Sequence, residues 1–495
     1  MEYEYIIGIG IYLAVMLAVG FWVKNKNKTA EDYLVAGRSF GMFRNTATLC
    51  SCTIAGTAIM AYPGTLYSFG FWSDELLWGG MVLIFGVSCI VFAGLFYMPK
   101  LWRMKLLTLG DFFYVRYGRS VGIMTTCLFA FTFAIWVAVQ MLVFAKVVGV
   151  ILGWDFMTSI FVATSVICIY TLMGGLYAVA YTDIIQVALV IIGLLILTPV
   201  AIGAVGGWDA LVDGTPGEKL QLIPHVASGN VILAYIGGFV IIALGSITSP
   251  DFMQRAYSAK SPAVARNSAL ASALVSWSVY AMVTCLTFAG IILIGDGVLS
   301  ADIVNEDPEL ILPLMFKTIM PTALVVLFVG AILAAVMSAA DSSLLALAGM
   351  LSKNIVKDVF KPDLNDHTLM RATQGLVLVI GILALIIATS LPSVVFLIAL
   401  GFDLILCCLF GPFTLGLYYK KANGYGALAG MAVGVFCRVI VAGCLNGFSM
   451  ENLILIEDWY VYTIFSPIAC IVTMVIVSEL TQKKNPPIPI KYYDA

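Results

Sequence analysis

The chain has 495 residues, of which 61% are hydrophobic and only 11% are charged, and its mean hydropathy is +1.02. Soluble domains contain about 45–50% apolar and about 25% charged residues, so this composition excludes a string of soluble domains and predicts an integral membrane protein. The net charge of −2 provides no basic surface for nucleic acid, and two histidines cannot build a histidine-rich metal site. We expect the lipid bilayer around the chain and no obligate protein partner.

A membrane-spanning helix needs about 20 mainly apolar residues. By this criterion the sequence predicts thirteen spans, one leading helix and twelve more, in an all-α fold. The spans cover residues 5–23, 41–68, 76–98, 121–149, 157–175, 182–203, 229–248, 268–294, 322–350, 372–391, 393–416, 424–444 and 459–479.

Basic residues gather in every second connecting segment. Lys24, Lys26 and Lys28 follow the leading span, and Arg255 belongs to a later group. Cytoplasmic loops retain Lys and Arg, so we predict a cell-membrane protein with its N-terminus outside and its C-terminus in the cytoplasm. Four of the 26 basic residues fall elsewhere, namely Lys146, Lys219, Lys317 and Arg438.

The second predicted span breaks the usual rules of a lipid-facing helix. Residues 45–58 are rich in Thr, Ser and Cys, and Gly56 near the middle allows the helix to open. An opened helix frees backbone carbonyls that can coordinate a cation. A packed helix whose hydroxyls bond its own carbonyls is the equally open alternative.

The span that covers 229–248 ends in a similar irregularity. Ser249-Pro250 interrupts the apolar run, and proline disfavours helix at the residue before it. Taken alone, this pattern also fits a simple helix end. Because both irregular spans begin a run of five, they instead indicate the discontinuous helices of a transporter's central site.

Two acidic residues lie at predicted membrane depth. Ser338, Asp341 and Ser342 share one helix face, and Asp183 belongs to another span. The nearest basic residue along the helix, Lys353, is about 18 Å from Asp341 at 1.5 Å per residue. Carboxylates and hydroxyls without a nearby base predict a site for a hard cation.

Other interpretations of these acids stay open. Either aspartate could be protonated and bonded to a neighbour, or could lie at the interface and reach water. Asp403 is a third candidate cation ligand, or the cap of a broken helix.

Several blocks resemble the sodium:solute symporter family. They are Tyr170–Gln186, with its Gly-Gly-Leu and Thr-Asp-x-x-Gln elements, Ala334–Ser338, Asp341–Ser343 and Gly424–Gly430. The resemblance implies one transporter domain over residues 1–495. It also implies a five-plus-five inverted repeat with discontinuous first and sixth core helices. The parts are a leading helix at 5–23, repeats at 41–203 and 229–416, and two trailing helices at 424–479.

The family also implies sodium as a transported co-substrate, with no organic cofactor. Position by position, one sodium ion would be held by the carbonyls of Ser51, Ile54 and Ala335 and by the hydroxyl of Ser338. The family usually places a second hydroxyl after that serine, but Ala339 stands here. A second sodium site of some members corresponds to Asp183, Ser338, Asp341 and Ser342.

Within the family, the ion-site blocks look most like those of the high-affinity choline transporters. A quaternary ammonium needs an aromatic cage. Trp136 occupies a cage position, but Ser249 stands where a tryptophan is expected, and no aromatic residue lies between Thr46 and Ala61. The full cage is therefore absent from the sequence.

We predict a sodium-coupled symporter that imports a small organic solute, and not an enzyme. The candidate solute contacts are Gly56, Thr57, Trp136, Gln140 and Ser249. A proton-coupled carrier of the same fold and a sodium-sensing membrane receptor without transport remain alternatives. The sequence does not indicate which solute, among amino acids, carboxylates, sugars and quaternary amines, is transported.

Overall fold

The computed structural model describes residues 2–23, 29–72, 80–172, 175–221, 229–391, 393–441, 444 and 459–493. These residues are helical almost throughout, and their β-pairing is limited to one isolated bridge between Phe40 and Ala259. The predicted all-α class is confirmed. Lys24, Lys26 and Lys28 of the orientation argument, and Met173 and Gly174 of the family-like block, lie outside the described residues.

Within the described ranges, nine helices are long and apolar enough to cross a bilayer, and two bent helix pairs pass the same test together. Two shorter apolar helices, Phe156–Leu172 and Gly424–Ile440, lie where the sequence predicts further spans. The protein is a multi-pass helical membrane protein. The nine helices are Tyr3–Val23, Ile84–Arg103, Arg119–Leu152, Gly175–Ala204, Pro262–Gly295, Thr322–Phe360, Asp366–Ser390, Val394–Tyr418 and Val461–Leu480.

The first bent pair is the span that the sequence predicts to open. Helix α3 (Met42–Thr53) stops, and the segment Gly56–Phe69 continues at an angle of 60°. The amide of Ile54 still donates to the carbonyl of Cys50, but Ile54 itself has φ −98° and ψ 64°, outside the helical region. The chain therefore leaves the helix at Ile54, as the prediction of an opened helix requires.

The second bent pair joins Tyr235–Thr248 to α15 (Pro250–Ser258) at an angle of 44°. Ser249 between them is extended, as expected for a residue before proline. Pro250 is well suited to the first turn of the new helix because its missing amide would have no partner there. This irregularity is thus a break between two helices and not only a helix end.

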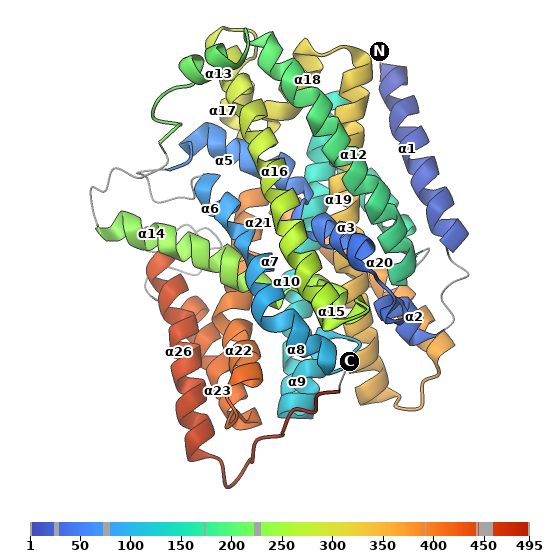
Figure 1. Ribbon diagram of the computed structural model, residues 1–495, viewed down its shortest axis with the longest axis vertical. Helices are drawn as coiled ribbons and strands as arrows, with labels where there is room; N and C mark the ends of the chain where they lie inside the picture. Colours follow the sequence, from blue (N-terminus) through green and yellow to red (C-terminus); the bar gives the residue numbers. More distant parts are fainter. Residues whose placement is uncertain are drawn as a thin grey trace.

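Figure 1 shows α1 (Glu2–Val23) and α26 (Trp459–Leu480) at opposite edges of the bundle. Helix α19 (Thr322–Met350) packs against α10 (Arg119–Leu152) and α12 (Gly175–Ala204). The most apolar windows of α10 and of the span containing α19 are 78% and 72% buried, against 22% for α1 and 33% for α26. Helices α10 and α19 therefore form the centre, and α1 and α26 present their apolar side chains outward.

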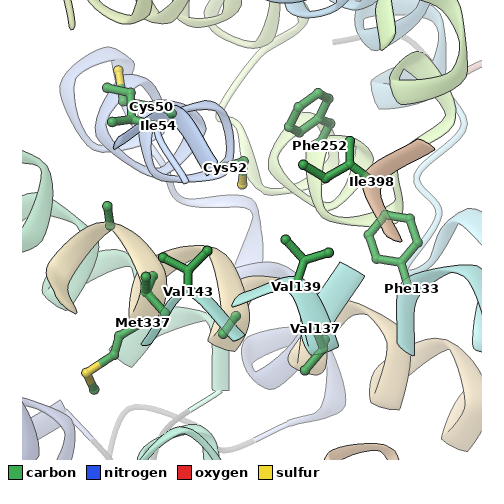
Figure 2. Close-up of a cluster of buried hydrophobic side chains, with 14 of the residues drawn as sticks. Cys50, Cys52, Ile54, Phe133, Val137, Val139, Val143, Phe252, Met337 and Ile398 are labelled. Atoms are coloured by element: carbon green, nitrogen blue, oxygen red, sulfur yellow. The ribbon is translucent and has the colours of Figure 1, made fainter. Parts of the chain in front are cut away.

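Helices from both broken spans share this centre. Figure 2 shows Cys50 and Cys52 of α3, with Ile54 at its end, in one buried cluster with Phe252 of α15 and with side chains of α10, α19 and α21 (Val394–Ile405). The two breaks are thus packed into the same core.

The remaining elements connect or extend these spans. They are α2 (Ala30–Val35), η2 (Ala36–Arg38), α4 (Gly56–Ile59), α5 (Ala61–Phe69), α6 (Gly80–Gly86), α7 (Ser88–Phe92), η3 (Ala93–Tyr97), α8 (Met98–Arg103), α9 (Leu109–Tyr117), α11 (Phe156–Leu172), α13 (Trp208–Gly214), α14 (Gly229–Val240), η4 (Ile241–Gly245), η5 (Ser246–Thr248), α16 (Pro262–Gly295), α17 (Ala301–Glu306), η6 (Pro308–Leu310), α18 (Ile311–Ile319), η7 (Leu351–Phe360), α20 (Asp366–Ser390), α21 (Val394–Ile405), η8 (Leu406–Phe410), α22 (Gly411–Tyr418), α23 (Gly424–Val435) and η9 (Phe436–Val441).

Candidate functional site

A charged cluster lies at the centre of the bundle. Asp183 of α12 and Asp341 of α19 are fully buried, and they are close enough to interact electrostatically. A guanidinium nitrogen of Arg255, from α15, lies 3.6 Å from the carboxylate of Asp183. The same nitrogen donates a hydrogen bond of 2.5 Å to the hydroxyl of Ser342. The structure therefore brings together three helices that are far apart in the sequence.

The interpretation that these acids have no nearby base is wrong for Asp183. From the sequence we predict Arg255 in an inner loop. Helix α15 instead continues for nine residues after the break, and all nine are buried. The continued helix carries Arg255 into the bundle, where it partly neutralises the acids. One guanidinium still faces two carboxylates, so the cluster keeps an excess negative charge if both acids are ionised.

Several polar atoms of this cluster have no hydrogen-bond partner among the described residues. They include both carboxylate oxygens of Asp183 and of Asp341, the hydroxyl of Tyr170 and the side-chain oxygen of Gln186. The side-chain nitrogen of Gln186 donates to the hydroxyl of Tyr12 at 3.0 Å. Buried oxygens without donors are costly unless a cation or water meets them. The donor set, carboxylate and neutral oxygen, is the kind that a hard cation prefers.

The first break lies beside this cluster. Ser51, one helical turn before the break, neighbours Asp183, and its hydroxyl donates to the carbonyl of Thr48 at 2.8 Å. On α19, the hydroxyl of Ser338 donates to the carbonyl of Ala335 at 3.1 Å. Both hydroxyl oxygens can still accept or coordinate because each donates only its proton.

Gly56 marks the place where α19 and α10 touch the break. A Cβ atom at position 56 would lie 2.5 Å from a methyl carbon of Val336 and 2.8 Å from one of Val143. The amide of Gly56 donates to the side-chain oxygen of Gln140 at 3.2 Å. Gly56 and Gln140 thus hold the break against α19 and α10. Neither residue lines the cavity between the two breaks.

A cavity of about 70 Å³ lies between the two breaks. Three of the five predicted solute contacts line it: Thr57 after the first break, Ser249 at the second, and Trp136 of α10. The ring centroids of Trp136 and Phe402 are 5.2 Å apart, and the two ring planes are tilted by 57°. The other described residues around the cavity are Cys52, Thr53, Ala55, Gly86, Val87, Cys89, Phe133, Ile242, Ser246, Asp251, Phe252, Tyr280 and Ile398.

Asp403 is not part of the cation cluster. Its carboxylate accepts a hydrogen bond from Arg438 and another, 3.0 Å long, from the hydroxyl of Thr463. The proposal that Asp403 binds a cation or caps a broken helix is therefore wrong. The guanidinium of Arg438 is already paired with this carboxylate. The two hydrogen bonds join α21 to η9, which contains Arg438, and to α26, which contains Thr463.

The described residues contain no group of three or more His, Cys, Asp or Glu side chains arranged for a bound metal. The cluster instead mixes two carboxylates with hydroxyls and backbone carbonyls. Such a mixture suits a weakly bound, exchangeable ion better than a resident transition metal.

A helical membrane bundle in which two broken helices meet at a cavity, beside unbalanced charge, has the architecture of a secondary transporter. Comparison with known proteins gives the family. Residues 33–434 match the sodium:solute symporter family, so the chain belongs to that family. The protein is a sodium-coupled solute symporter and not an enzyme.

Relatives of known activity align over most of the chain. The high-affinity choline transporter 1 of Drosophila melanogaster is 28% identical over 88% of this chain and 70% of its own. The osmoregulated proline transporter OpuE of Bacillus subtilis is 27% identical over 88% of each chain. A Na+-coupled sialic acid symporter, solved in a substrate-bound, outward-open state, shares the fold with a TM-score of 0.79 and 21% identity, over 96% of this chain and 98% of its own. Mhp1, a nucleobase-cation-symport-1 family transporter, aligns with a TM-score of 0.57 and 15% identity, over 93% of this chain and 96% of its own.

Sequence reasoning does not single out Arg255, Asp251, Tyr12, Tyr170 or Gln186 as site residues. The sequence does contain one signal for Arg255 and Asp251. Pro250 followed by an acid is typical of a helix start, and a helix that starts there carries residues 251 and 255 inward on neighbouring turns.

Proposed function

We propose that this protein imports a small organic solute by alternating access and that sodium binds where α3, α12 and α19 meet. The observation that carries the proposal is the set of buried carboxylate oxygens of Asp183 and Asp341, which accept no hydrogen bond from any described residue. A cation there would replace repulsion between the two acids with attraction.

The proposed ligands fall into two overlapping groups. The carbonyls of Ser51, Ile54 and Ala335, with the hydroxyl of Ser338, would form one sodium site. Asp183, Ser338, Asp341 and Ser342 would form the other. The break at Ile54 supports the first group because it frees helix carbonyls. The proximity of Arg255, Asp183 and Ser342 supports the second, since it gathers these side chains around one point.

The solute would bind in the cavity between the breaks, next to Thr57, Trp136 and Ser249, and would extend toward Gly56 and Gln140, which are bonded to each other just outside the cavity lining. Sodium bound at the first break would fix the broken helix in the geometry that receives the solute. Each positive charge that moves inward gains about 2.3 kcal/mol per 100 mV of membrane potential, which can drive accumulation of the solute.

We further propose thirteen spans in the cell membrane, with the N-terminus outside and the C-terminus in the cytoplasm. The leading helix would cover 5–23, the inverted repeats 41–203 and 229–416, and the trailing helices 424–479. The two bent pairs, Met42–Thr53 with Gly56–Phe69 and Tyr235–Thr248 with Pro250–Ser258, support this division because each lies near the start of one repeat.

The test measures thermal stability and uptake with the purified protein. Sodium, compared with potassium, is expected to raise the melting temperature of the wild type and of Asp302→Asn, which changes an exposed acid. Asp341→Asn is expected to lose the sodium response. In proteoliposomes, uptake of labelled amino acids, carboxylates, sugars and quaternary amines is screened under an inward sodium gradient. Uptake that follows pH and ignores sodium would contradict the proposal.

A further inference from the structure

The cavity between the breaks has one charged residue among its described lining. Asp251, the second residue of α15, lines the cavity and is 3% exposed. Its carboxylate accepts a hydrogen bond of 2.9 Å from the amide of Phe252 and lies beside Cys52. A carboxylate in such a place needs a positive partner.

The protein supplies too few positive charges near the cavity. Asp183, Asp251 and Asp341 are three buried acids, and Arg255 is the one basic side chain that interacts with all of them in the described part of the chain. The guanidinium of Arg255 bonds Ser342 and Gln254 and faces Asp183. It is not among the residues that line the cavity. One sodium ion bound among the two overlapping ligand groups would still leave one negative charge without a partner, and a second sodium ion would balance it.

Five aromatic side chains line the cavity together with Asp251. The ring centroids of Trp136 and Phe402 are 5.2 Å apart with the ring planes tilted by 57°, and Phe133, Phe252 and Tyr280 also line the cavity. The faces of aromatic rings attract organic cations, and they do so more strongly when water is excluded. The aromatic cage that is incomplete in the sequence is thus partly rebuilt by residues from α10, α15, α16 and α21.

At the start of each half-helix, one amide that could bind a solute carboxylate already has an acceptor. The amide of Gly56 donates to Gln140, and the amide of Phe252 donates to Asp251 itself. Helix N-termini attract anions, but a carboxylate at the second break would meet Asp251 at close range. The occupied amides and the charge of Asp251 therefore disfavour the binding of an anionic group in the cavity.

We propose that the cavity binds a small organic cation without a carboxylate, and that Asp251 is its counter-ion. This inference rests on the proposed function, since it assigns a substrate class to the same cavity. The aromatic rings would hold the apolar part of the cation, and the charge of Asp251 would replace the missing members of the cage.

Four probes separate charge from shape. Choline and ethanolamine are cations. Glycine betaine carries the trimethylammonium group of choline with an added carboxylate, and 3,3-dimethyl-1-butanol has the shape of choline without its charge. Each is titrated against the purified full-length protein in sodium and in potassium, and the shift of melting temperature gives an apparent Kd.

We expect sodium-dependent stabilisation by at least one of the two cations and none by the betaine or the neutral alcohol at the same concentrations. Asp251→Asn should weaken cation binding by about tenfold or more and keep the response to sodium alone, which also shows that the variant folds. Asp302→Asn, at an exposed site, should match the wild type in both responses.

The outcomes separate the two proposals. If the wild type shows no response to sodium at all, the proposed function fails. If sodium stabilises the protein but neither cation does, or if the betaine or the alcohol binds as well as choline, the assignment of an organic cation is wrong and the proposed function stands. Unchanged cation affinity in Asp251→Asn would overturn the role of Asp251.

Discussion

The guanidinium of Arg255 lies 3.6 Å from the carboxylate of Asp183, and neither side chain is accessible to solvent. The two residues come from α15, after the second break, and from α12. Arg255 therefore ties the helix after the second break to the acids that we propose as sodium ligands. Because Arg255 is part of the chain, it is a permanent positive charge that limits how many sodium ions the cluster can hold.

Arg255→Gln should destabilise the protein because it leaves Asp183 buried without its cation. Removing one partner of a buried ion pair costs about 3–5 kcal/mol. The loss should be smaller in sodium than in potassium, since a sodium ion can take the place of the guanidinium. Denaturant or thermal unfolding of the purified protein in both salts measures the effect.

The double variant Arg255→Gln/Asp183→Asn serves as the rescue, and it should recover part of the stability in potassium, because Asp251 and Asp341 still lack the guanidinium. Arg266→Gln is the matched control, because Arg266 is exposed and its side chain donates to the neighbouring Asn267. Equal stability of Arg255→Gln and the wild type in potassium would show that the pair does not stabilise the fold.

Gly56→Ala should disturb the packing of the first break against α19 and α10. Its new methyl group would lie 2.5 Å from Val336 and 2.8 Å from Val143, so α19 or α10 must move. We expect sodium affinity and uptake to fall together, because the carbonyl of Ile54 lies two residues before the clash. Gly56→Ala/Val336→Ala removes the closer methyl group and should restore part of both. Sodium titration by thermal shift measures the effect, and no rescue would mean that the clash is relieved elsewhere.

Rules that depend on a few neighbouring residues predicted the two breaks, and the structure explains why these predictions are correct. Gly56 and Ser249-Pro250 change the backbone itself, so their effect is visible in a few neighbouring residues. The placement of Asp183 and Asp341 inside the membrane also followed from the apolar runs around them.

The partners of the acids could not be predicted in the same way. Arg255 reaches Asp183, 72 positions earlier in the chain, only because α15 is buried on all sides. Arg438 likewise pairs with Asp403 from a different helix. A buried charge and its partner are matched by tertiary packing, and their separation along the chain carries no regular signal.

Asp403→Asn should reduce stability and leave the sodium response unchanged. Its carboxylate accepts hydrogen bonds from Arg438 and Thr463, so the neutral variant removes the negative charge from a buried ion pair, at a cost of about 3–5 kcal/mol. The cluster around Asp341 is not involved, and the apparent affinity for sodium should stay within about twofold of the wild type. Unfolding and sodium titration of the same sample test both parts. A lost sodium response with unchanged stability would return Asp403 to the cation site.

Ala339→Ser should tighten sodium binding. Ala339 follows Ser338 on α19 at the position where the family usually has a second hydroxyl, and it is buried beside the proposed site. A neutral oxygen ligand worth about 1 kcal/mol would raise the affinity roughly fivefold. Ala340→Ser is the matched control, since the next residue is turned about 100° around the helix and faces elsewhere. Sodium titration by thermal shift compares the three proteins. If Ala340→Ser tightened binding as much as Ala339→Ser, the gain would come from added polarity and not from a ligand, and the assignment of Ser338 to the sodium site would lose its support.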